Sequence, residues 1–222
     1  MWSMSIPHID KLSNKKFNKI VTGDWSVKEK IDGSSVTLIS CKGIKTLKTS
    51  THEWKSFSEI PDECWTRDFR ICFKVLEKLE GDFFLEGEFI GDRQTNTITY
   101  DESWCFVSYY GFNHKPITVS VDIVDTDDGI CDRKVSKTFT VKFINLPSLK
   151  LEKPIFQSHD IKVMKHHWYK ELSTQLDKES ILGGSIEGLV VICDDVMFKI
   201  VDRDKFTKLN YFYHFVKYCI LG

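Results

Sequence analysis

One lysine lies in a setting that could make it a covalent nucleophile. Residues 27–35 read VKEKIDGSS, which places Lys30 between two acidic residues and shortly before Gly33. Alternating residues before this lysine and β-rich residues after it predict two strands joined by a tight hairpin turn. A lysine held deprotonated at such a turn can attack an electrophile. Taken alone, the stretch also fits an exposed lysine beside a turn glycine.

Two carboxylates fall on one face of a later predicted strand. Residues 83–91 read FFLEGEFIG, and Glu86 and Glu88 are two positions apart. Side chains two apart on a strand point to the same side, so the two acids share a face. This pattern indicates a polar pocket. An ordinary strand with one solvated face is the alternative.

An acid and a lysine also lie within apolar segments near the end of the chain. Glu187 precedes GLVVI, and Lys199 lies within VMFKIV. Asp194 and Asp195 predict a hairpin turn between these two strands, so we expect Lys199 to lie close to Glu187. A glutamate that leads a buried strand needs a metal ion or a cation as its partner.

Composition sets the boundaries for these hypotheses. The chain has 222 residues, 41% of them hydrophobic and 28% charged, with a net charge of −1, which fits a soluble globular protein. We expect one domain, residues 1–222. Without a global basic field, any nucleic-acid contact must come from a local patch. The seven cysteines have no CxxC spacing, so neither a disulfide framework nor a thiolate zinc site is expected.

The sequence predicts no contact with a membrane. The first twelve residues lack the apolar run of a signal peptide, and no apolar run reaches the roughly 20 residues that span a bilayer. We therefore expect a cytoplasmic protein, or one in the host cytoplasm if its source is viral.

Helical and strand periodicities predict an α+β fold. Amphipathic helices are expected at 67–80, 160–178 and 202–221, a strand at 104–112, and two or three strands within 118–143 around an acidic turn at 125–129. In the helix at 67–80, Arg70 is expected on the solvent face. His166 and His167 are adjacent on the second helix and do not face one another, which makes them a poor metal site.

Three lysines at three-residue spacing follow the first strands. Lys42, Lys45 and Lys48 fit either a solvated edge strand or a cluster that contacts phosphate, and the sequence leaves both readings open.

Four of these segments resemble a known family when they are taken in order. They are EKIDG at 29–33, EGE at 86–88, EGLVV at 187–191 and FKI at 198–200. Their order and spelling resemble motifs I, III, IV and V of ATP-dependent RNA ligases, and the first two look closest to the nick-sealing bacteriophage group. The strand that ends at Tyr109 and Tyr110 resembles motif IIIa. The resemblance spans about residues 29–205, and four motifs in order are far more specific than one.

The resemblance implies an adenylyltransferase reaction. Lys30 would attack the α-phosphate of ATP and carry AMP, Lys199 would bind that phosphate, and Glu187 would hold Mg²⁺ or Mn²⁺. The AMP would pass to a 5′-phosphate RNA end, which a 3′-hydroxyl then seals. The nearby carboxylates of Glu29 and Asp32 would favour the charged lysine, so a metal ion and Lys199 are needed to oppose them.

The remaining assignments concern the nucleotide itself. Glu29 would fix the adenine edge, Glu88 would contact the ribose, and Tyr110, or Tyr109 in another register, would stack on adenine. The full set of implied nucleotide-binding residues is Glu29, Ile31, Gly33, Lys48, Glu88, Tyr110 and Glu187. Lys48 stands in for the basic residue of motif Ia.

The chain departs from the family pattern at several positions. Val201 occupies the place of a second motif V lysine, with Arg203 and Lys205 as substitutes, and Ser35 replaces the asparagine that often follows the motif I glycine. The implied fold is an ATP-grasp-like nucleotidyltransferase domain of two mainly antiparallel sheets with flanking helices and no OB-fold.

Other functions stay open at this stage. A guanylyltransferase or DNA ligase module is one alternative, and a nucleic-acid end-binding protein without turnover is another. A monomer is possible.

Overall fold

The computed structural model describes residues 6–63, 66–91, 98, 100–125, 133–194 and 196–201. The chain divides into two compact units, and each is described by itself. The first holds the described residues of Gly33–Asp92 and Glu102–Leu146. The second holds those of Ser5–Asp32, Arg93–Asp101 and Pro147–Gly222.

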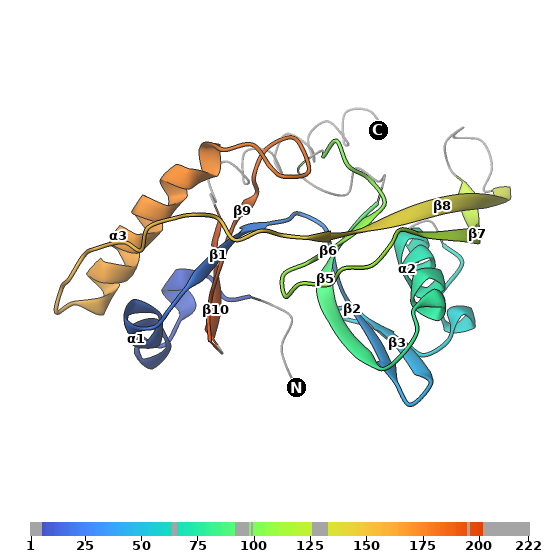
Figure 1. Ribbon diagram of the computed structural model, residues 1–222, viewed down its shortest axis with the longest axis horizontal. Coiled ribbons are helices and arrows are strands. Elements are labelled where there is room, and N and C mark those ends of the chain that lie inside the picture. The colour runs from blue at the N-terminus through green and yellow to red at the C-terminus, as the bar shows by residue number, and fades with distance from the viewer. Residues whose placement is uncertain are drawn as a thin grey trace, which may run out of the picture. The chain divides into compact units, whose positions relative to one another are not determined.

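A seven-stranded sheet forms the first unit, in the order β4-β3-β2-β5-β6-β8-β7 (Figure 1). Its strands are β2 (Ser34–Cys41), β3 (Ile44–Lys48), β4 (Glu53–Trp54), β5 (Phe83–Ile90), β6 (Cys105–Ser108), β7 (Ile117–Asp125) and β8 (Arg133–Asn145). All neighbours pair antiparallel except β6 and β8, which run parallel. The prediction of a mainly antiparallel sheet is confirmed for this unit.

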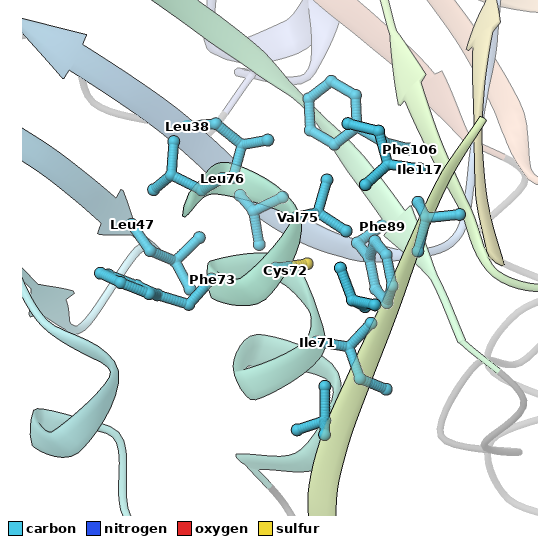
Figure 2. Packing of buried hydrophobic residues seen from close by; sticks show 14 of the residues in the cluster. Leu38, Leu47, Ile71, Cys72, Phe73, Val75, Leu76, Phe89, Phe106 and Ile117 are labelled. Carbon is cyan, nitrogen blue, oxygen red and sulfur yellow. The ribbon is translucent and has the colours of Figure 1, made fainter. Parts of the chain in front are cut away.

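Helix α2 (Arg67–Lys78) covers one face of this sheet, after a short 3-10 helix, η2 (Phe57–Glu59). Its predicted apolar stripe is buried at Cys72, Phe73 and Leu76. Figure 2 shows these side chains meeting those of the strands, including Leu38 and Phe89. Burial of such a stripe, rather than helix propensity alone, is what fixes a short helix in place.

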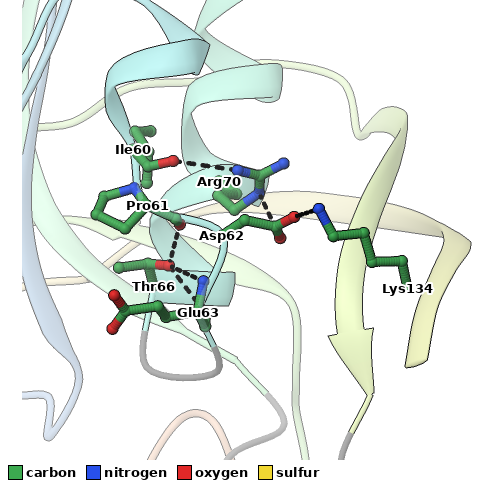
Figure 3. Close-up of polar contacts among 7 residues, drawn as sticks. All are labelled: Ile60, Pro61, Asp62, Glu63, Thr66, Arg70 and Lys134. Carbon is green, nitrogen blue, oxygen red and sulfur yellow. Dashed lines mark hydrogen bonds and ion pairs between the residues drawn. The ribbon is translucent and has the colours of Figure 1, made fainter. Parts of the chain in front are cut away.

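Arg70 departs from the prediction that it faces solvent, because it is only 8% exposed. Its guanidinium donates to the carbonyl of Ile60 at 3.1 Å, lies 3.9 Å from Asp62 and stacks 4.3 Å from the ring centre of Phe57 (Figure 3). The long side chain places its stem along apolar surface and its charged head beside a carbonyl, a carboxylate and an aromatic ring. Periodicity cannot anticipate this, because the partners lie outside the helix.

A three-stranded antiparallel sheet forms the second unit, in the order β1-β9-β10. Its strands are β1 (Ser26–Lys30), β9 (Gly188–Cys193) and β10 (Val196–Val201). One face packs on α1 (Asn14–Thr22) and α3 (Ile161–Ser173), with the 3-10 helices η1 (Ile9–Lys11) and η4 (Thr174–Asp177) beside them. Phe17, Trp168 and Phe198 are fully buried there.

The predicted hairpin around Lys30 is wrong. Strand β1 pairs with β9, whereas β2 pairs with β3 and β5, so the two strands belong to different sheets. Gly33 serves a different purpose from the predicted turn: a Cβ there would lie 2.7 Å from Ile90 Cδ1 and 3.0 Å from the carbonyl oxygen of Phe89. The glycine permits close approach to β5.

Several other predicted elements are adjusted. Strand β6 covers only part of 104–112, and 118–143 holds two strands, β7 and β8. Three predicted features lie outside the described residues. They are the helix at 202–221, which contains Arg203 and Lys205, the turn residue Asp195, and residues 126–129 of the acidic turn. Among the described helices, none is long and apolar enough to cross a membrane.

Candidate active site

Three lysines share one face of the three-stranded sheet. Pairing aligns Lys30 with Gly188 and Val201 in one row, and Lys28 with Val190 and Lys199 in another. Residues in these two rows point to the same side, because rows two positions apart share a face. The intervening row, which contains Leu189, points into the apolar core of this unit. The sheet therefore separates a basic face from its packed face.

Lys30 pairs with Glu187 on this unit. The Nζ of Lys30 donates to Glu187 Oε2 and, at 3.3 Å, to the carbonyl of Ile31. Burial raises the pKa of Glu187, while the charges of Lys30 and Lys199 act in the opposite direction. Lys199 is therefore close enough for its charge to act on Glu187, in agreement with the proximity expected from the sequence. The direct partner of Glu187, which the sequence did not predict, is Lys30.

The Glu29 side chain lies on the packed side of β1 and is 4% exposed. Its Oε2 accepts the backbone N–H of Ile181 at 3.0 Å. Burial raises the pKa of Glu29, and hydrogen bonds from Ser180 and Ile181 oppose that rise. The carboxylate thus ties β1 to the loop ahead of β9.

Tyr100 is a residue near Lys30 that the sequence did not point to, and its partner is the backbone of Asp32. The backbone N–H of Asp32 donates to the Tyr100 hydroxyl at 2.8 Å, and the N–H of Ile98 donates to Asp32 Oδ2 at 3.1 Å. Burial raises the pKa of Tyr100 well above its ordinary value, so the phenol stays neutral. A single tyrosine after a polar segment carries no sequence signal for this role. These bonds fix the backbone directly after Lys30.

The first unit carries its predicted residues on one sheet face. Thr37 pairs with Lys48 on one side and with Glu86 on the other, and Ser35 pairs with Glu88. All five point away from the face that α2 covers, because Val36 and Leu38 alternate with them and lie in the core. Both acids are half-buried, and burial raises the pKa of Glu86.

Tyr109 and Tyr110 follow the end of β6 and differ sharply in exposure. Tyr109 is 5% exposed, and Tyr110 is 62% exposed. Partial burial and the charge of Glu86 raise the pKa of Tyr110. Of the two candidates for stacking, Tyr110 alone presents a ring that a base could reach, and it belongs to the same unit as Glu86 and Glu88.

The donor set around Glu187 fits a hydrated hard cation rather than an all-protein cage. Within the part of the chain that the structure describes, no group of three or more His, Cys, Asp or Glu side chains could hold a metal ion. Glu187 lies near Asp32, whose charge raises its pKa. Mg²⁺ keeps several waters and binds through one or two carboxylates together with substrate phosphates. Glu187 and Asp32 can provide those carboxylates.

Comparisons with known proteins agree with the sequence motifs at the level of fold. No protein-family model matches the sequence, and no curated protein matches it. The solved structures that it resembles include variants of Naegleria gruberi RNA ligase with AMP and Mn (17% identity, TM-score 0.53, covering 94% of this chain and 58% of that one) and with ATP and Mn (18%, 0.53, 95% and 58%). The same ligase with PPi gives 19% identity, a TM-score of 0.52, and coverage of 94% and 58%.

The chain spans less than two thirds of these ligase chains. At such low identity the likeness concerns the fold. The chain has a mixed α+β fold similar to that of the RNA ligase structures.

Proposed function

We propose that this protein is an ATP-dependent RNA ligase that carries AMP on Lys30. The observation that carries the proposal is the pairing of Lys30 with Glu187, because segments 157 residues apart bring a candidate nucleophile and a carboxylate into contact. Both groups are largely buried, in a sheet whose basic face also holds Lys199. The solved structures that the chain resembles are those of an RNA ligase with AMP and Mn, with ATP and Mn, or with PPi.

The chemistry follows from this pair. The amine of Lys30 can attack only after it loses its proton, and the ion pair with Glu187 stabilises the protonated form. Glu187 is also the residue that would hold Mg²⁺ or Mn²⁺, with Asp32 nearby. A bound divalent ion supplies charge neutralisation at the triphosphate. A Lys30 released from Glu187 would form the N–P bond to the α-phosphorus as the P–O bond to pyrophosphate breaks.

Lys199 would bind the α-phosphate, as the family resemblance implies. Phosphoryl transfer depends mainly on positioning and on cations that neutralise developing charge. Lys28 lies on the same sheet face, in one row with Val190 and Lys199. It is therefore a candidate for the second cation that Val201 does not provide.

The nucleoside contacts form part of the same proposal. The family resemblance implies nucleotide contacts for Glu29 and Ile31 of the second unit and for Gly33, Lys48, Glu88 and Tyr110 of the first. Glu29 and Ile31 would contribute backbone groups, because their side chains are buried. The substrate would be RNA with a 5′-phosphate and a 3′-hydroxyl end. The proposal also includes an ATP-grasp-like nucleotidyltransferase fold for the described residues.

Self-nucleotidylation tests the proposal directly. Purified protein is incubated with Mg²⁺ or Mn²⁺ and either ATP or GTP, and the intact mass is measured. We expect one added AMP from ATP alone, with no adduct on Lys30→Met and a retained adduct on Lys170→Met, which changes an exposed lysine of α3. A GMP adduct would indicate a guanylyltransferase instead. No adduct on folded protein would favour the end-binding alternative.

A further inference from the structure

A cavity of about 590 Å³ lies in the second unit, and the proposed ligase chemistry does not use it. Helix α3 forms one wall, and η1 with the start of α1 forms the other. Side chains that line it include His8, Asn14, Lys162, Lys165, His166 and Tyr169. Its size falls in the range of small-molecule sites, about 300–1,000 Å³.

Lys165 gives the cavity an unbalanced buried charge. The residue is 8% exposed, and its Nζ donates to the carbonyl of Leu12 at 2.6 Å and lies 5.8 Å from the ring centre of Phe17. Among the described residues, no carboxylate forms an ion pair with it. An ammonium has three donors, and a buried charge without a counter-ion is costly. An anion in the cavity would relieve that cost.

A second lysine reinforces the preference for an anion. Lys162 and His166 also line the cavity, and the lining contains a single acid, Asp10, which bonds to His8 Nδ1 at 2.8 Å. The lining therefore holds two lysines and one carboxylate, and that carboxylate is bonded to His8. The site selects against cations and favours a group with several acceptor oxygens, such as phosphate.

Flat rings indicate what the phosphate is attached to. His8 and Tyr169 pack with ring centres 5.5 Å apart and line the same cavity as Lys165. Aromatic faces bind nucleobases by stacking, and such stacking tolerates any base. Asn14 adds an amide that can both donate and accept hydrogen bonds.

We propose that this cavity binds a nucleotide, with its phosphate at Lys165 and Lys162 and its base against the rings of His8 and Tyr169. The nucleotide is either free or a unit of an RNA strand, and the two sources share this chemistry. The free-nucleotide arm is independent of the proposed ligase activity, and the RNA arm rests on it.

Histidine NMR tests the proposal at the cavity itself. Ring resonances of His8 and His166, assigned with His8→Asn and His166→Asn variants, are followed at constant pH during titration with inorganic phosphate, AMP, or a 5′-phosphorylated oligoribonucleotide. The protein carries Lys30→Met, so no covalent adduct forms and the result does not depend on ligase chemistry. We expect saturable shifts with AMP or the oligonucleotide at lower concentration than with phosphate.

Lysine variants give the decisive contrast. Lys165→Met and Lys162→Met should each weaken binding by about tenfold or more, because each removes a charge-assisted hydrogen bond. Lys162 is exposed, so its variant keeps the test valid if Lys165→Met fails to fold. Lys170→Met, on the same helix but outside the cavity, should leave binding unchanged.

The relative affinities of AMP and the oligonucleotide identify the source. Absence of shifts in the parent protein, unchanged binding in both lysine variants, or AMP and RNA binding no tighter than phosphate would each overturn the proposal.

Discussion

Each unit contains a partly buried cation paired with a carboxylate, yet the two pairs are built differently. Arg70 is held by a carbonyl, Asp62 and the face of Phe57, and Asp62 is held in turn by Lys134 at 2.5 Å (Figure 3). Lys30 is held by Glu187 and by its own neighbour's carbonyl. Arg70 is thus fixed from several sides, whereas Lys30 depends on one exchangeable carboxylate.

Under the proposed function, the Arg70–Asp62 ion pair is structural and the Lys30–Glu187 ion pair is reactive. A guanidinium keeps its charge under all ordinary conditions and suits permanent anchoring, whereas an amine can lose its proton when its partner is taken away. The comparison predicts that substitutions in the first pair alter stability and that those in the second alter chemistry.

The largest effect on adduct formation should come from replacing Lys30, and it is compared with the separate replacement of Arg70. Lys30→Met should abolish the AMP adduct, a loss of at least about 1,000-fold, because no other group replaces a covalent nucleophile. Arg70→Met should retain the adduct while lowering the unfolding free energy by about 2 kcal/mol. Intact mass and urea denaturation measure both outcomes. Loss of adduct in a fully folded Arg70→Met protein would contradict the separation of roles.

Glu187 should give the next largest effect. Glu187→Gln keeps the shape of the side chain but removes the charge, so we expect about 100-fold slower adduct formation and a higher requirement for Mg²⁺. Rates are measured across a Mg²⁺ titration, with the exposed Glu179→Gln as the matched control. A normal rate in Glu187→Gln would assign the pair a purely structural role.

Each sheet contains a glycine that lies too close to a neighbouring strand to carry a Cβ. A Cβ at Gly87 would lie 2.2 Å from the carbonyl oxygen of Val107, and one at Gly188 would lie 2.3 Å from that of Ile200. We expect either alanine substitution to lower the unfolding free energy by about 2 kcal/mol, because a neighbouring strand must shift. Gly188→Ala should also slow adduct formation, since Gly188 is the partner of Lys30 in the sheet. Equal adduct rates in the two stable variants would argue against this coupling.

The smallest effect concerns pH at Asp62. The hydrogen bond from Lys134 is the largest cause that lowers the pKa of Asp62, followed by the charge of Arg70. A depressed folded pKa means that the stabilisation is present above the unfolded value, about 3.9, and is lost as pH falls through the folded value. Asp62→Asn should therefore cost about 1 kcal/mol at pH 7 and progressively less below pH 4. Urea titrations at both pH values check this, and a constant difference would rule out the ion pair.

Local patterns predicted much of the fold and failed where distant segments meet. The stripes of α2 and α3, the shared face of Glu86 and Glu88, and the β9–β10 hairpin follow from periodicity and turn residues. Helix α1 was missed, although Ser13 accepts the N–H of Lys16 as its N-cap and Phe17 and Ile20 are spaced as a helical stripe.

The candidate site shows the same division. The order of the motifs predicted that Lys30, Glu187 and Lys199 form one group. All three belong to the second unit, which brings them together. The pairing of β1 with β9, rather than with β2, could not be predicted from neighbouring residues, because the residue pattern within a strand does not identify its partner strand. Tyr100 was invisible for the same reason: its value lies in a contact with a backbone amide 68 positions away.

The pairing of β1 with β9 also has a consequence for how the protein is made. Strand β1 is synthesised before its partner, which begins at Gly188, so it cannot pair until the long segment between them has been made. Contacts of such separation carry a loop-closure cost and slow folding. Until they form, Lys30 has no carboxylate from Glu187 beside it. A chain cut before β9 therefore lacks the Lys30–Glu187 pair, and formation of this pair reports that β1 and β9 have come together.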